Sequence, residues 1–71
     1  MTHHRLGSLC TFVTDVSLWE KIELPCEILG TMQMKDFAVV LSEPVGDIRR
    51  DFYVKVLTRF GVGYVAKGSL K

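Results

Sequence analysis

The chain has 71 residues, enough for one small domain with a single hydrophobic core. Its 48% hydrophobic and 24% charged residues are typical of a folded globular domain. No run approaches the roughly 20 apolar residues of a membrane span, and no apolar signal segment follows the first residues. We therefore expect one domain over residues 1–71, located in the cytoplasm, with residues 1–5 disordered.

The net charge of +1 is unevenly distributed. Residues 1–43 hold three basic and six acidic side chains, a net charge of −3, whereas residues 44–71 hold six basic and two acidic ones, a net charge of +4. In one small domain such a dipole more often orients a protein partner than a nucleic acid. The distribution therefore favours a protein partner and leaves nucleic acid as an alternative.

The first predicted element is a strand over residues 6–13, which read LGSLCTFV. Its alternation places Cys10 and Phe12 on one face and Leu9 and Val13 on the other. The next segment, Asp15 to Pro25, contains breakers and closely spaced charges, so we interpret it as a long loop or irregular hairpin. A single helical turn over Ser17–Lys21, capped by Ser17, is an alternative there.

Two strands follow, residues 28–34 and residues 37–41, joined at Lys35-Asp36. The segment from Ser42 to Asp51 contains a proline and a glycine, and we expect an exposed loop.

The last third of the chain predicts a hairpin. FYVKVLT forms one strand, Phe60-Gly61 a two-residue turn, and VGYVA the next strand. This turn pairs Thr58 with Gly63, Leu57 with Tyr64 and Val56 with Val65. Three valines then share the interior, and four larger side chains share the other face. The interior set is Val54, Val56 and Val65, and the outer set is Tyr53, Lys55, Leu57 and Tyr64.

About five short strands and no helix of normal length indicate an all-β domain, and a small antiparallel barrel is the economical way to close such a set. The order of parts resembles the SH3-like barrel. The parts are Gly7-Ser8-Leu9, the long acidic loop with Trp19, Gly30-Thr31-Met32, Val54-Lys55-Val56, Gly63-Tyr64-Val65 and Lys67-Gly68-Ser69-Leu70. The resemblance implies an antiparallel SH3-like barrel of about five strands with one short 3₁₀ turn near the C-terminus, ending in a buried Leu70.

The glycines near the C-terminus are expected to have structural roles in this fold. We expect Gly61 to supply a positive φ, Gly63 a close approach and Gly68 the freedom for the 3₁₀ turn. A phosphate-binding loop would need a helix after the glycines, and none can follow here.

Neither catalysis nor a cofactor is expected. The only histidines, His3 and His4, lie at the N-terminus, and a metal site would need both of them to reach Cys10 and Cys26. We expect free thiols and no metal. The carboxylate pairs Glu20 with Glu23 and Asp47 with Asp51 fall in predicted loops, where solvated charge is the default.

The remaining function class is binding. In peptide-binding SH3-like domains, strand aromatics and an acidic loop form a groove, which implies Trp19, Tyr53 and Tyr64 as its floor and Glu20 and Glu23 as selectors of charge. The resemblance therefore predicts a non-enzymatic interaction module or small accessory subunit, of the sort found in phage, bacterial or plastid complexes. The tandem aromatic motif of proline-peptide grooves is absent. An equal alternative for Trp19 is a lid that folds back over the core.

The alternative function is nucleic-acid binding. Tyr53 or Tyr64 would stack on bases, and five basic residues would contact phosphates: Arg49, Arg50, Lys55, Arg59 and Lys67. The pI of 7.8 lies below that of domains in which phosphate contacts dominate affinity.

The chain ends at Lys71, which leaves little for a final strand. We expect an uncovered apolar edge that a symmetric dimer or a partner's strand would complete. The residues expected to contribute to it are Leu9, Phe12, Phe37 and Val39. Alternatively, the loop from Ser42, with Pro44 and the arginine pair, covers this edge and keeps the chain monomeric.

Overall fold

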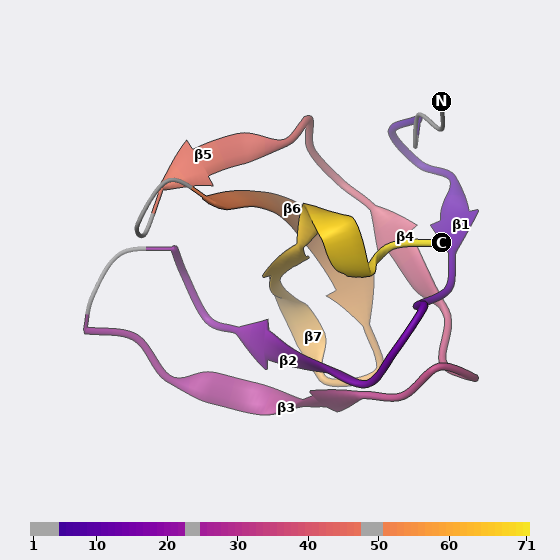
Figure 1. The fold of residues 1–71 in the computed structure, drawn as a ribbon, viewed down its shortest axis with the longest axis horizontal. Helices are drawn as coiled ribbons and strands as arrows, with labels where there is room; N and C mark the ends of the chain where they lie inside the picture. The colour runs from indigo at the N-terminus through magenta and orange to yellow at the C-terminus, as the bar shows by residue number, and fades with distance from the viewer. Residues whose placement is uncertain (1–4, 23–24, 48–50) are drawn as a thin grey trace.

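The computed structural model describes residues 5–22, 25–47 and 51–71. These residues form seven strands and one 3₁₀ helix (Figure 1). The elements are β1 (Leu9–Cys10), β2 (Val16–Trp19), β3 (Ile28–Met32), β4 (Ala38–Val40), β5 (Val45–Asp47), β6 (Asp51–Thr58), β7 (Gly61–Ala66) and η1 (Lys67–Ser69). Every strand pair is antiparallel. The all-β antiparallel class and the short 3₁₀ turn near the C-terminus are therefore confirmed.

The strands form one sheet in the order β1-β4-β6-β7-β2-β3, with β5 attached to β6. Figure 1 shows this sheet curving around the centre of the molecule. The sheet is not closed, because within the described ranges no pairing joins β1 to β3.

The C-terminal residues cover the segment that follows β1. Phe12 and Leu70 form an isolated antiparallel bridge. The Val13 N–H donates to the Ser69 carbonyl at 2.9 Å, and the Lys71 N–H donates to the Thr11 carbonyl at 2.9 Å. The segment that we expected to be left open by the short C-terminus is thus paired by the last three residues.

Two strands were not expected from the sequence. Val16–Trp19 is strand β2, so the long loop and the helical turn considered there were wrong. The other interpretation, an irregular hairpin, is closer to the structure, because β2 pairs antiparallel with β3 with a register shift between Leu18 and Trp19. The side chains of this segment alternate as in a strand, because Leu18 is fully buried and its neighbours Ser17 and Trp19 are half-buried. Within the predicted exposed loop, Val45–Asp47 forms β5 and pairs with the first residues of β6. Arg49 and Arg50, in the same loop, lie outside the described residues.

The β6–β7 hairpin is present with a different turn. Its turn residues are Arg59 and Phe60, so Thr58 pairs with Gly61 and Val56 with Gly63. The predicted register is therefore off by two residues. A shift of two preserves the faces of a strand, since side chains alternate with a period of two. Consequently the three interior valines, Val54, Val56 and Val65, are at most 2% exposed, as predicted.

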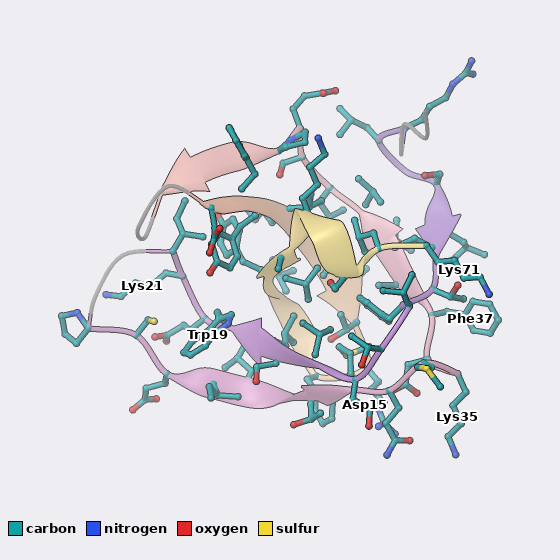
Figure 2. All side chains as sticks on the ribbon, in the orientation of Figure 1. Asp15, Trp19, Lys21, Lys35, Phe37 and Lys71 are labelled. Atoms are coloured by element: carbon teal, nitrogen blue, oxygen red, sulfur yellow. The ribbon has the colours of Figure 1, made fainter. Side chains whose placement is uncertain are left out.

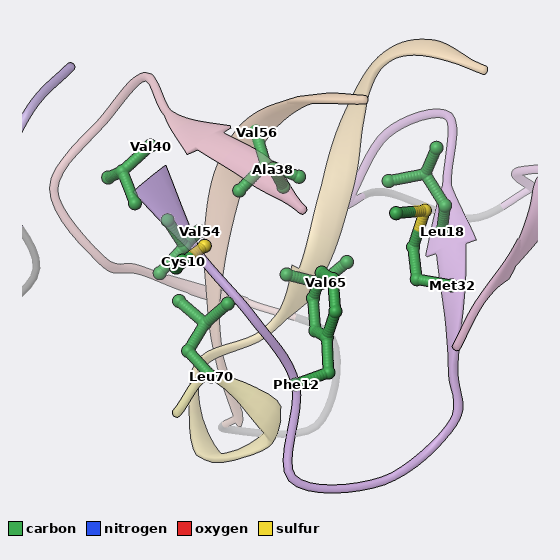
Figure 3. Packing of buried hydrophobic residues seen from close by; sticks show 10 residues of the cluster. All are labelled: Cys10, Phe12, Leu18, Met32, Ala38, Val40, Val54, Val56, Val65 and Leu70. Carbon is green, nitrogen blue, oxygen red and sulfur yellow. The ribbon is translucent and has the colours of Figure 1, made fainter. Parts of the chain in front are cut away.

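Ten residues build the core (Figure 3), and they come from six strands, the segment after β1 and the residue after η1. They are Cys10, Phe12, Leu18, Met32, Ala38, Val40, Val54, Val56, Val65 and Leu70. The predicted faces of the first segment are confirmed, because Cys10 and Phe12 are buried and Leu9 and Val13 are exposed. Phe12, only 2% exposed, therefore cannot belong to an uncovered surface, and that expectation was wrong. Burial of Leu70, also expected, is confirmed.

Gly61 begins β7 with φ +102°, a conformation that residues with a Cβ rarely adopt, so the predicted positive φ is confirmed. Gly68 has no positive φ and has open space around its missing Cβ. The 3₁₀ helix therefore does not require glycine at position 68.

Candidate protein-binding surface

Side chains from three neighbouring strands form a row on the outer face of the sheet. Tyr64 of β7 lies opposite Lys55 of β6 on one side and opposite Trp19 of β2 on the other. Directly opposite residues of antiparallel strands share a face, so these three side chains are cross-strand neighbours. All three are half-buried. We call Lys55, Tyr64 and Trp19 the aromatic row.

The local sequence explains why this row faces outward. Val65 and Leu18, the sequence neighbours of Tyr64 and Trp19, are fully buried, so alternation turns the two aromatic rings to the other face. Gly63 carries no side chain, and the space that a Cβ would occupy lies against Leu18 and the Trp19 carbonyl. The missing side chain therefore allows β2 to approach β7 closely enough to pair.

Trp19 lies at the end of β2 (Figure 2) and does not belong to the core cluster. Its neighbour Leu18 holds the core position of this part of β2. On its other side Trp19 pairs with Ile28 of β3, which is 53% exposed. Sequence reasoning missed Ile28, because a register shift between Leu18 and Trp19 places it on the outer face. No local signal in the sequence marks that shift.

Tyr53 lies close to the row without belonging to it. It is half-buried, two residues before Lys55 on β6, and it pairs with Ala66 of β7 and Val45 of β5. Tyr53 and Tyr64 are therefore diagonal neighbours on one face, within reach of a single extended ligand.

Acidic residues lie at the Trp19 end of the row. Glu20 is exposed, and its N–H donates to the Glu27 carbonyl at 2.8 Å. Beside them lies an open depression of about 370 Å³, lined by Glu20, Pro25, Cys26 and Glu27. Glu23, the second expected charge selector, lies outside the described residues. Sequence reasoning missed Glu27, which only the pairing of β2 with β3 brings next to Glu20.

Three of the five basic residues considered for nucleic acid lie in the described part of the chain, on different elements. Lys55 lies in the aromatic row, Arg59 in the β6–β7 turn and Lys67 in η1. Arg59 and Lys67 flank opposite ends of β7. Because β7 has six residues, its two ends are roughly 20 Å apart. Arg59 also forms an ion pair with Asp36 at 3.3 Å and lies 4.8 Å from the centroid of the Phe60 ring. Arg59 and Lys67 therefore do not lie side by side, and the charge of Arg59 is partly offset by Asp36.

Metal-ligating and nucleophilic side chains are few in the described parts of the chain. They contain no group of three or more His, Cys, Asp or Glu side chains that could hold a metal ion. His3 and His4 lie outside them. Cys10 is buried in the core, and burial raises the pKa of its thiol; Cys26 is half-buried. Within the same residues no helix has the length and apolarity to cross a membrane.

No protein-family model, curated protein or solved structure matches this chain.

Proposed function

We propose that the chain is a non-enzymatic SH3-like interaction module that binds an extended segment of a protein partner on its aromatic row. The observation that carries the proposal is the register that sets Trp19, Tyr64 and Lys55 side by side on three strands. Aromatic side chains in a row offer flat apolar contact area at low entropic cost, which suits an extended peptide.

The order of elements supports the SH3-like barrel within this proposal. A hairpin, β6–β7, is followed by a 3₁₀ turn, and a buried leucine then pairs with the segment that follows the first strand. The resemblance stated from the sequence rests on the same order of parts.

The charge beside the row suggests the chemistry of the ligand. Glu20 is exposed next to Trp19, and Glu27, also exposed, lines the same depression. Lys or Arg side chains in the bound segment would meet these carboxylates with opposite charge. The ligand we propose is therefore an extended segment with apolar residues and at least one basic residue.

The test is selection of peptides from a displayed random library on the immobilised protein, with counter-selection on the Tyr64→Ala variant. We expect peptides enriched in Lys or Arg that bind the wild type and not the variant. Trp19 is the only tryptophan of the chain, so its fluorescence reports binding to the row directly. Circular dichroism checks that the variant is folded.

Two charge variants complete the experiment. Glu20→Gln removes a carboxylate beside the row, and Glu43→Gln removes another exposed one in the connection between β4 and β5. We expect only Glu20→Gln to weaken binding of the selected peptides. Failure to enrich any peptide over the Tyr64→Ala background would refute the proposed function.

A further inference from the structure

Among the described residues, no strand pairs with the outer edge of β3. Strand β3 ends the strand order and pairs only with β2 among the residues described. Figure 1 shows β3 at the periphery, with β2 on one side of it. The opposite end of the sheet differs, because the residues after β1 are paired by the C-terminal segment. The N–H and C=O groups on the free edge of β3 are therefore available to another strand.

The free edge lacks the charge and proline that usually protect edge strands. From Ile28 to Met34 the sequence reads ILGTMQM, without a charged residue or a proline. Ile28 and Met34 are 53% and 58% exposed. A register shift near Leu29 is the one protective feature. By contrast, β5 has only three residues, follows Pro44 and ends at Asp47.

The ring of Phe60 does not occupy this edge. Its nearest ring atoms lie 2.9 Å from the position that a Cβ atom of residue 30 would occupy. Since Cβ atoms project out of the plane of a sheet, the ring covers a face of β3 and leaves the hydrogen-bonding direction open.

Only the residues of β3 itself can pair with an added strand. After Met32 the backbone is already engaged: the Gln33 N–H donates to Asp36 Oδ2 at 2.8 Å, and the Met34 N–H donates to Asp15 Oδ1 at 3.3 Å. An added strand therefore pairs with Ile28–Met32.

Charges at the two ends of this segment indicate its occupant. Glu27 directly precedes β3, and Lys35 lies in the turn that follows it; both are exposed. Antiparallel pairing of two β3 strands about a two-fold axis brings Glu27 of each copy toward Lys35 of the other. Parallel pairing would instead bring like charges together. The uncharged strand between them adds no repulsion.

We propose that a second copy of this chain binds the free edge, by antiparallel pairing of β3 with β3 across a two-fold axis. Five residues per strand make a contact smaller than the ~800 Å² per partner of a stable interface. The dimer is therefore in rapid equilibrium with the monomer and forms only at high protein concentration. It leaves the aromatic row on the outer face available.

The experiment is light scattering over a dilution series of the full chain at low salt. We expect the mass to rise from 8.0 kDa toward twice that value as concentration increases, and to fall again when salt is added. A mass of 8.0 kDa at every concentration overturns the proposal.

Charge reversal identifies the edge. Glu27→Lys and Lys35→Glu each place like charges at both ends of the paired strands, so each weakens the dimer several-fold. The double variant restores opposite charges and restores the dimer. Lys67→Glu, on η1, is the matched control and leaves the dimer unchanged.

Dimerisation of a single-reversal variant as strongly as the wild type, or failure of the double variant to recover, contradicts pairing at β3. Lys35→Glu separates this proposal from the proposed function, because Lys35 lies in the turn after β3 and outside the proposed peptide-binding residues, whereas Glu27 lines the depression beside the row. Loss of self-association by Lys35→Glu with intact peptide binding supports pairing at β3, and loss of peptide binding by Tyr64→Ala with intact self-association bears on the aromatic row alone.

Discussion

Gly63 of β7 lies directly against Leu18 of β2: a Cβ atom at position 63 would stand 2.7 Å from Leu18 Cγ. The same atom would stand 2.8 Å from the Trp19 carbonyl oxygen, which is backbone and cannot rotate away. This contact fixes the distance between β7 and β2. The packing of the core and the position of Trp19 in the aromatic row therefore depend on the same glycine.

We predict that Gly63→Ala destabilises the protein by about 1–3 kcal/mol, because an added methyl group overpacks a closed site. Chemical denaturation followed by circular dichroism measures the change. Gly68→Ala is the matched control, since the space around Gly68 is open, and it should leave the midpoint nearly unchanged. Equal effects of the two substitutions would contradict this account of β2–β7 packing.

Leu70→Ala should cost about 2–5 kcal/mol, as expected for truncation of a buried leucine. Leu70 is 8% exposed and bridges to Phe12, so its loss opens the core and loosens the C-terminal cover. Leu9→Ala removes the same atoms from a side chain that is 67% exposed and should cost far less. Thermal unfolding of both variants measures their stability. Similar losses of stability would show that Leu70 does not close the core.

Asp36→Ala should destabilise the protein more than Arg59→Ala. The Asp36 carboxylate accepts a hydrogen bond from the Gln33 N–H at 2.8 Å and so closes the turn between β3 and β4. Its ion pair with Arg59 involves a side chain that is 58% exposed, and such pairs contribute about 0–1 kcal/mol. Unfolding of the two single variants and of the double variant separates the contributions. A larger loss for Arg59→Ala would reverse the interpretation.

Stability should fall at alkaline pH through Cys10. Burial raises the pKa of its thiol, so the folded state keeps the proton after the unfolded chain has lost it. The resulting stabilisation is complete below the thiol's ordinary pKa and is lost as pH rises toward the raised value. The difference in unfolding free energy between wild type and Cys10→Ala should therefore shrink with rising pH. A difference that stays constant across that range would argue against an effect of Cys10.

Nucleic acid should bind weakly if at all. Arg59 and Lys67 lie at opposite ends of β7, and Arg59 is ion-paired with Asp36. Fluorescence titration with single-stranded and duplex DNA and RNA at low salt measures the affinity. Tight binding that weakens steeply as salt is added would instead indicate phosphate contacts and favour the nucleic-acid function.

The sequence by itself determined which side chains face the core in the first strand and in the β6–β7 hairpin. Alternation assigned Cys10 and Phe12 to the inside, as it did the three valines of the hairpin. These predictions survived a register error of two residues, because burial depends on the parity of a position and not on its partner. Hydrophobic periodicity is a local property and is therefore readable from one sequence.

Only the tertiary structure decided which strands are neighbours. Breakers and closely spaced charges around Val16–Trp19 favoured a long loop or irregular hairpin, and the segment forms β2 by pairing with β3 and β7. That pairing places Trp19 beside Tyr64, 45 positions later in the chain, and leaves the outer edge of β3 unpaired among the described residues. The physical reason is that strand order depends on contacts between distant segments, such as the fit of Leu18 against Gly63, which no local pattern encodes.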